Sequence, residues 1–426
     1  MHCIRKILLL LVVAFTLSGC AMATLDELYC LPKRSEEYEN LQAVIDKAMT
    51  DLSYSAPRYG DNRQALQMAD LDGDGIDEYI LFAKGDSDKP LKILIFSQLA
   101  SGCVLMDTIE GYGFAFDFVS YAQLDNKPGL ELVVGWQLSN QVMRSVSVYR
   151  FSSGTSRQLM NASYNEISTA DMNQDGISEL FLLTSSPSDK GAGTARLYSY
   201  RDGELERSEE LQLSAPMNSF KQLTVSRLPD GTPAIYVTCS ADSQKLVTDV
   251  FVMDGDNLTT LASGIYVQSI DNYYVYPVDI DNDGIMELPR VVPLCPVSDS
   301  DATQYMIQWY NLGENLAEVN KISTYHNYSQ NWYITLDESM LQDLSVRTTE
   351  EGSVFYYQGV EIFTIMMFTD ADREELSAQP GCTVLYGSDT VIYAVMIMEA
   401  EKEAVIAEDL ISRFHPIRVD LNTEED

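Results

Sequence analysis

Basic residues and histidine are scarce in this sequence. Its 426 residues include 28 Lys+Arg against 64 Asp+Glu, and the formal net charge is −36. This charge argues against nucleic acid and anionic lipid headgroups as electrostatic partners, because both need clustered Lys and Arg. The presence of only three His also argues against most His-based catalysis and His-rich metal sites. The acidic composition instead favours a bound cation, or a neutral or basic surface partner.

Catalytic motifs are missing as well. The sequence contains no G-x-S-x-G, H-E-x-x-H or P-loop pattern. Paired carboxylates of the kind that glycosidases use are abundant, but the conspicuous pairs belong to the repeated loops described below. His326 and His415 have no visible partner in the sequence, and we expect them to be surface or packing residues. The sequence therefore favours a protein that is not an enzyme, without settling the question.

Cysteine provides neither a zinc site nor a complete disulfide framework. Of the seven cysteines, Cys3 and Cys20 fall in the N-terminal segment. The other five are widely spaced and form no C-x-x-C pair. We expect them to be small buried side chains, with one disulfide as the alternative. They are Cys30, Cys103, Cys239, Cys295 and Cys382.

An export signal is predicted at residues 1–19. Arg5 and Lys6 precede an apolar run of 11 residues from Ile7 to Leu17. This run is too short to span a bilayer but suits the hydrophobic region of a signal peptide. No other apolar stretch of the sequence approaches the roughly 18 residues that a membrane helix requires.

The signal ends in Leu-Ser-Gly-Cys at Cys20, which resembles the lipobox of bacterial lipoproteins. In that family the signal is cleaved before the cysteine and the thiol is lipidated. The resemblance implies that Cys20 carries a lipid, that residues 20–34 are a tether, and that the protein is anchored to the bacterial cell membrane on its extracytoplasmic side. The alternative is an ordinary signal peptide with a chance cysteine.

An amphipathic helix is predicted at residues 35–53. Ser35 is a suitable N-cap, and the acidic residues that follow favour the positive end of a helix. Apolar residues recur at helical spacing from Tyr38 to Leu52. We expect this apolar face to pack against the domain that follows.

A repeated nine-residue pattern decides the expected fold. Three copies, beginning at Asp70, Asp171 and Asp279, fit D-x-[DN]-x-D-G-x-x-E, and each runs directly into a strand-like segment. Two degenerate copies begin at Gln123 and Ser226, so that successive starts are 53, 48, 55 and 53 residues apart. About four short strands in a unit of ~50 residues are typical of a β-propeller blade. A β-solenoid, the alternative, normally has much shorter repeats.

The predicted fold is therefore mainly β. We expect a β-propeller of about five to seven blades over residues 54–325, in a closed or partly open ring. From about residue 326 the repeat stops, and strands mix with two helical stretches. This change predicts a small α+β domain over 326–420, followed by an acidic tail at 421–426.

The repeated pattern also predicts metal sites. It places oxygen ligands at positions 1, 3, 5 and 9, allows the carbonyl at position 7 to contribute, and provides Gly for the tight turn at position 6. Carboxylates this crowded repel one another unless a cation offsets their charge. Ca²⁺ suits six or seven flexible oxygen ligands better than Mg²⁺ does. An EF-hand is excluded, because position 12 is Leu81, Leu182 or Arg290 rather than Glu, and strands follow instead of helices.

These loops resemble the FG-GAP/VCBS repeats of integrin-α-type β-propellers over about residues 55–325. The resemblance implies about three structural Ca²⁺ ions. The implied ligands of the first loop are Asp70, Asp72, Asp74, the carbonyl of Ile76, and Glu78. Those of the second loop are Asp171, Asn173, Asp175, the carbonyl of Ile177, and Glu179. Those of the third loop are Asp279, Asp281, Asp283, the carbonyl of Ile285, and Glu287.

The two degenerate copies depart from the family pattern. Lys127 stands at position 5 of the copy that begins at Gln123, where its ammonium group is expected to take the place of the ion. Ala234 stands at position 9 of the copy that begins at Ser226, which predicts a loop without metal. Only five repeats are readable, against the seven blades usual in integrins.

The sequence favours a non-enzymatic binding or scaffold module at the cell surface, with an unknown surface protein or glycan as partner. The alternatives are a carbohydrate-binding or carbohydrate-processing propeller, and a structural subunit of an envelope assembly complex. Aromatic residues that stack on sugars are plentiful, but they are also ordinary strand residues. They include Tyr273, Tyr274, Tyr276, Trp309, Tyr310, Tyr325, Tyr328, Trp332 and Tyr333.

Overall fold

The computed structural model describes residues 36–138, 144–188, 191–201, 203–369, 371, 373–398 and 407–417. The predicted signal peptide (1–19), Cys20, the tether (20–34) and the acidic tail (421–426) lie outside these residues. Strands make up 55% and helices 9% of the structure, so the expectation of a mainly β protein is confirmed. Among the described helices, none is both long enough and apolar enough to cross a membrane.

The first described element is helix α3 (Glu36–Ala48), which is shorter than the predicted 35–53. It ends early because the chain turns at residues 49–51 and then forms β1, which pairs with the first sheet. Leu41 and Ile45 are buried against that sheet. The side chain of Asn40 accepts a hydrogen bond of 3.0 Å from the backbone N–H of Cys103. The helix therefore packs against the following domain, as its apolar face predicted.

Four antiparallel sheets follow in chain order. The first contains β1 (Ser53–Tyr54), β2 (Leu66–Ala69), β3 (Glu78–Lys84), β4 (Leu91–Leu99) and β5 (Gly102–Gly111). The second contains β6 (Ala115–Ala122), β7 (Glu131–Gln137), β8 (Arg144–Ser152) and β9 (Thr155–Tyr164). The third contains β10 (Glu166–Ala170), β11 (Glu179–Thr184), β12 (Thr194–Arg201), β13 (Glu204–Arg207) and β14 (Leu211–Gln212). The fourth contains β15 (Phe220–Arg227), β16 (Pro233–Asp242), β17 (Lys245–Asp254) and β18 (Asn257–Gln268).

Two further sheets complete the described structure. The fifth contains β19 (Leu288–Pro293), β20 (Tyr305–Leu312), β21 (Glu318–Asn327), β22 (Trp332–Thr335) and β28 (Phe414–Pro416). The sixth contains β23 (Leu344–Thr348), β24 (Ser353–Tyr357), β25 (Val360–Phe368), β27 (Ile392–Ile397) and β26 (Cys382–Gly387). Helices α4 (Arg373–Ser377) and α5 (Ala407–Arg413) accompany them. Short 3-10 turns occur at Met217–Ser219, Glu314–Leu316, Tyr328–Gln330 and Glu338–Met340.

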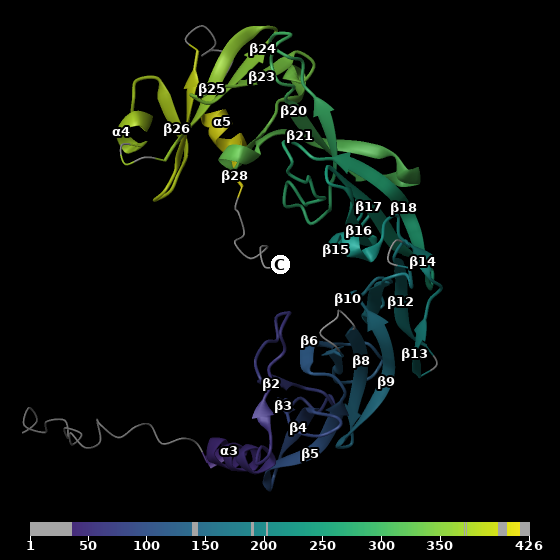
Figure 1. Cartoon of the computed structure of the whole chain (residues 1–426). Coiled ribbons are helices and arrows are strands. Elements are labelled where there is room, and N and C mark those ends of the chain that lie inside the picture. Colours follow the sequence, from purple (N-terminus) through teal and green to yellow (C-terminus); the bar gives the residue numbers. More distant parts are fainter. Residues whose placement is uncertain are drawn as a thin grey trace, which may run out of the picture.

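The sheets stack face to face along an open arc (Figure 1). Strands β2, β6 and β10 lie toward the concave side, while β5, β9 and β13 lie toward the convex side (Figure 1). The first sheet and the C-terminal sheets do not meet in this view, and none of the sheets is closed on itself.

The stacking explains why the central strands are apolar along their whole length. In β11 all six residues are buried. Leu180 and Leu182 join a core with the second sheet, whereas Phe181 and Leu183 join a core with the fourth. Because successive side chains of a strand point to opposite faces, a sheet covered on both sides loses the alternating polar pattern.

The expected domain boundary at residue 326 falls inside β21. The fifth sheet draws β19 to β21 from one side of this boundary and β22 and β28 from the other. Tyr325, Trp332 and Phe355 then share one core between the fifth and sixth sheets. Helices α4 and α5 form the two helical stretches expected after residue 326. Residues 399–406, just before α5, lie outside the described part of the chain.

Candidate metal centres

The three complete copies of the repeat form loops before the strands β3, β11 and β19. The glutamate of position 9 begins β3 and β11, and Glu287 directly precedes β19. The glycine of position 6 has a positive φ of 87° at Gly75, 88° at Gly176 and 84° at Gly284. This is the left-handed turn that the sequence predicted, and it brings the later residues of each loop back toward the first aspartate.

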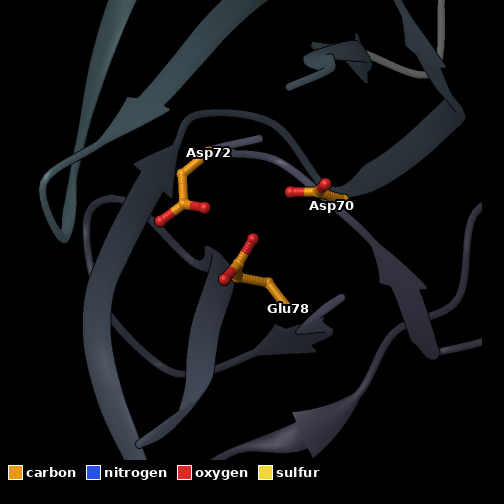
Figure 2. A group of neighbouring side chains, drawn as sticks. All are labelled: Asp70, Asp72 and Glu78. Carbon is orange, nitrogen blue, oxygen red and sulfur yellow. The ribbon is translucent and has the colours of Figure 1, made fainter. Parts of the chain in front are cut away.

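The first loop gathers three carboxylates around a common space. Carboxylate oxygens of Asp70, Asp72 and Glu78 lie within 4.8 Å of one another, and their side chains point toward one another (Figure 2). Asp70 also accepts hydrogen bonds from the backbone N–H of Gly73 at 2.7 Å and of Gly75 at 3.0 Å. The predicted ligand Asp74 is not part of this three-residue group, and its Oδ1 accepts the backbone N–H of Ile76 at 2.7 Å.

Glu78 is the most enclosed of these ligands. Only 2% of its surface is exposed, and its Oε2 accepts the backbone N–H of Leu71 at 3.0 Å. Burial raises the pKa of the Glu78 carboxyl, and the neighbouring carboxylates of Asp72 and Asp74 raise it further. A buried carboxylate beside like charges is costly unless it takes up a proton or binds a cation. The donor set is entirely oxygen, which fits Ca²⁺ or Mg²⁺ rather than a soft metal.

The loop that begins at Asp279 forms a second group. Carboxylate oxygens of Asp279, Asp281 and Glu287 lie within 4.8 Å of one another. Here Lys321 of β21 reaches in: its Nζ lies 2.5 Å from Asp283 and 3.3 Å from Asp281. The ammonium group lowers the pKa of the Asp283 carboxyl. A metal at this loop would therefore share its carboxylates with a lysine.

The loop that begins at Asp171 is organised differently. Its position 3 is Asn173, whose amide donates a hydrogen bond of 3.0 Å to Asp175. In the described part of the chain, the groups of three converging acidic ligands occur in the first and third complete loops and not in this one. Burial raises the pKa of the Glu179 carboxyl to about 7, and the charges of Asp175 and Asp171 add to this effect.

The three isoleucines at position 7 have a clear backbone role. The N–H groups of Ile76, Ile177 and Ile285 donate to the carboxylate at position 5 of their own loop, at 2.7, 2.8 and 2.9 Å. These bonds fix the turn, and the carbonyl groups of the isoleucines remain predicted ligands.

The degenerate loop that begins at Gln123 contains a built-in cation. Arg150 of β8 donates from one guanidinium nitrogen to Asp125 and to Glu131, at 2.7 Å each. Its other terminal nitrogen donates to the carbonyl of Pro128 at 2.7 Å. Asp125 and Glu131 are wholly buried. The guanidinium thus binds the side chains of positions 3 and 9 and a loop carbonyl.

The expectation for Lys127 was therefore wrong. Its Nζ lies 3.6 Å from Oδ2 of Asp125, the side chain is half-exposed, and the ammonium group lies over the ring of Tyr200. Arg150 fills the loop instead, because a residue one strand away can enter from the core side. The sequence offered one signal for Arg150, a lone charge inside the otherwise uncharged strand Ser145–Phe151.

Strand register explains what stands opposite each position 9. Position 10 pairs with Phe96, Tyr149, Tyr198, Phe251 and Tyr310 in the five repeats. Because the strands are antiparallel, the residue that follows each of these partners faces position 9. In the five repeats this residue is Ser97, Arg150, Ser199, Val252 and Asn311. The glutamate has a neutral polar neighbour in the three complete loops and an arginine in the second repeat. In the fourth repeat, Ala234 pairs with Val252, and both are buried in an apolar core.

Neighbouring loops touch one another along the arc. The N–H of Leu130 donates to the carbonyl of Asp70 at 3.0 Å, and the N–H of Ser178 donates to the carbonyl of Gln123 at 2.7 Å. Gln174 donates to the carbonyl of Gly231 at 2.9 Å. These hydrogen bonds connect the loops of the first four sheets in chain order.

The two described histidines and several of the clustered aromatic residues pack against one another. His326 stacks on Tyr333 with ring centroids 4.8 Å apart, and its Nε2 lies 2.9 Å from the hydroxyl of Thr324. Burial lowers the pKa of His326 to about 3. Tyr273 stacks on Tyr328 at 5.2 Å. Cys103, Cys239, Cys295 and Cys382 are free thiols, and Cys30 lies outside the described residues.

Comparison with known proteins identifies no family. No protein family model matches the chain, and no curated protein matches it either. Among solved structures, the exotype rhamnogalacturonan lyase YesX is 13% identical, with a TM-score of 0.31, over 64% of this chain and 56% of that one. A candidate 6-phosphogluconolactonase from Bacteroides uniformis is 12% identical, with a TM-score of 0.28, over 68% of this chain and 84% of that one. Likeness at this level carries no functional inference.

Proposed function

We propose that this chain is an exported, lipid-anchored protein whose Ca²⁺-binding loops stabilise a non-enzymatic binding or scaffold module at the cell surface. In this proposal the stacked sheets are FG-GAP/VCBS-type blades of a β-propeller that stays partly open. The observation that carries it is the shared design of the loops. The buried position-9 glutamate pairs with Arg150 in one repeat, whereas in two of the complete loops it lies beside two aspartates of its own loop.

The calcium is proposed to be structural. The position-9 glutamate accepts a backbone N–H from position 2 of its own loop in all four repeats that have it, at 3.0, 2.7, 2.8 and 3.1 Å. A cation that binds this glutamate therefore fixes the turn before a central strand. Because the loops also bond to their neighbours, an ordered loop supports the contact between two sheets.

Calcium titration tests the metal assignment. Isothermal titration of the full chain should give binding in the range of about 10⁻⁴–10⁻³ M that is typical of extracellular modules. Asp70→Asn and Asp279→Asn should each remove one site. Asp256→Asn, an exposed side chain outside the complete loops, is the matched control. Mg²⁺ should bind more weakly, because it needs a rigid octahedral shell.

Each outcome of this titration has a meaning. Loss of a site in each loop variant, with no change in the control, supports the assignment. Equal calcium binding by the wild type and by a variant with both substitutions would show that the ions sit elsewhere.

The membrane anchor is tested separately. Cys20→Ala should move the protein from the membrane fraction to the soluble extracytoplasmic fraction, since a lipid on Cys20 is the proposed anchor. An unchanged membrane fraction in this variant would contradict the lipoprotein proposal and leave the calcium proposal intact.

A further inference from the structure

A cavity of about 610 Å³ lies among the first three sheets, away from the metal loops just described. It is lined by the segment Tyr59–Asn62 between β1 and β2, by residues of β6, β8 and β9, and by the start of β10. Strands β2, β6 and β10 lie on the concave side of the arc (Figure 1). The cavity therefore opens where inner strands of successive sheets come together.

The lining of this cavity is acidic. Asp61, Asp117 and Glu166 line it, against the single cation of Arg144. The Nη1 of Arg144 lies 3.7 Å from Oδ2 of Asp117, which is longer than a hydrogen bond. One guanidinium cannot offset three carboxylates, so the lining keeps a negative excess.

Asp117 is an unusual member of this lining. Only 3% of its surface is exposed, and its Oδ2 accepts a hydrogen bond of 2.5 Å from the hydroxyl of Tyr164. Its Oδ1 is buried and accepts no hydrogen bond from any described residue. A buried acceptor without a donor destabilises the fold, and in native proteins it calls for an explanation such as a ligand or a bound ion.

Glu166 stands next to Asp117 and is also short of donors. The described residues donate no hydrogen bond to its carboxylate. Burial raises the pKa of that carboxyl, the charge of Arg144 lowers it in part, and the charge of Asp117 raises it by a smaller amount. The carboxylates of Asp117 and Glu166 therefore line one cavity that offers few hydrogen-bond donors.

The outer wall of the cavity is rigidly built. The N–H of Tyr59 donates to the carbonyl of Asp117 at 2.9 Å, and the amide of Asn62 donates to the carbonyl of Val119 at 3.2 Å. Arg63 donates to the carbonyl of Gly60 at 2.8 Å. Tyr59 itself is 58% exposed, so an accessible aromatic residue lies in the lining beside the acidic side chains. A pre-formed wall reduces the entropy lost when a ligand binds.

We propose that this cavity binds a basic side chain, the guanidinium of Arg or the ammonium of Lys, presented by a partner protein. These groups are donors only and carry the charge that the lining lacks. The apolar stem and the charged head would lie along the ring of Tyr59. The inference rests on the proposed binding function and names the chemistry of the partner.

The molecule contains an internal precedent for this arrangement. Arg150 lies between Asp125 and Glu131, where two buried carboxylates hold one guanidinium. The net charge of −36 also steers a basic partner toward the protein. A neutral sugar has hydroxyl donors but would leave the excess charge of the lining without a counterion, so it is the less suitable occupant.

The test uses small probes on the full chain in millimolar Ca²⁺. Nα-acetyl-arginine amide and Nα-acetyl-lysine amide should bind in isothermal titration. Nα-acetyl-citrulline amide, which has nearly the same shape without the charge, should bind at least about tenfold more weakly, since tenfold corresponds to about 1.4 kcal/mol. Binding should weaken as salt is raised, because salt screens charge pairs near the surface.

Two variants locate the binding. Asp117→Asn and Glu166→Gln should each weaken the arginine probe about tenfold, whereas Asp256→Asn, far along the chain and exposed, should leave it unchanged. Glu166 is less buried than Asp117, so its variant keeps the test valid if Asp117→Asn fails to fold.

Three results would overturn the proposal: no binding of the basic probes, equal binding of citrulline, or full affinity in folded Glu166→Gln protein. Binding of an uncharged probe such as maltose in place of the basic probes would assign the cavity to sugars instead. The calcium response of the same samples is read separately. A normal response without probe binding rejects the cavity proposal alone.

Discussion

The loops that begin at Asp70 and Gln123 each bury acidic side chains, but they differ in what offsets the negative charge. Both bury a position-9 glutamate, Glu78 or Glu131, against a backbone N–H of position 2. Arg150 supplies the compensating charge in one loop, while in the other the facing residue is Ser97 and acidic neighbours add to the repulsion. The difference teaches that a repeat keeps its geometry when a side-chain cation takes the place proposed for a metal ion.

Removal of the guanidinium of Arg150 should have the largest effect on the free energy of unfolding. Arg150→Met leaves Asp125 and Glu131 buried without a partner, and breaking a buried ion pair costs about 3–5 kcal/mol. Urea unfolding should show this loss both with Ca²⁺ and with chelator, since this loop is proposed not to use the ion. The exposed Arg157→Met is the control. A loss below about 1 kcal/mol would contradict the role given to Arg150.

The next largest loss of stability should come from disturbing the contact between the loops that begin at Asp70 and Gln123. Gly129 has a φ of +95°, and a Cβ there would lie 2.4 Å from the carbonyl oxygen of Leu71. Gly129→Ala should destabilise the protein by about 2–4 kcal/mol through clash and backbone strain. Gly75 has a φ of +87° with nothing near its Cβ position, so Gly75→Ala measures the conformational cost alone, about 1 kcal/mol. Equal losses in thermal unfolding would show that the close approach of the loops is unimportant.

A pH series should reveal the buried glutamate of the loop that begins at Asp171. The pKa of Glu179 is raised to about 7 from 4.5, so its protonation stabilises the calcium-free fold. This contribution is complete below about pH 4.5 and is lost as the pH rises through about 7. In chelator, wild type should therefore gain about 1–3 kcal/mol relative to Glu179→Gln between pH 7 and pH 5. Parallel pH profiles for the two proteins would contradict this prediction.

An arginine introduced opposite Glu78 should make the loop that begins at Asp70 resemble the loop that contains Arg150. Ser97→Arg places a guanidinium at the position that Arg150 occupies in the next sheet. We expect this variant to bind one calcium ion fewer and to lose the stabilisation that this ion gives, about 1–3 kcal/mol at concentrations of about 10 to 100 times Kd. Ser199→Arg offers the same exchange in the loop that begins at Asp171. Undiminished calcium binding in a folded Ser97→Arg protein would show that charge compensation does not govern the loop.

The sequence predicted those features that depend on neighbours along the chain. The strands after each loop and the tight turn at Gly75 follow from local pattern. The role of Arg150 could not be read in this way, because it depends on the register between β7 and β8. The cavity near Asp117 was also missed, since its lining comes from three sheets. The expected boundary at residue 326 separates by composition segments that the fifth sheet joins by strand pairing.

The central claim is that the complete loops hold Ca²⁺ and that this ion stabilises the arc of sheets. The most direct measurement is the melting temperature of the full chain in chelator and in millimolar Ca²⁺, with the Asp70→Asn, Asp279→Asn double variant beside it. The wild type should have a higher melting temperature in Ca²⁺ than in chelator, and the double variant should show a much smaller rise. Identical melting curves of the wild type in chelator and in Ca²⁺ would contradict it.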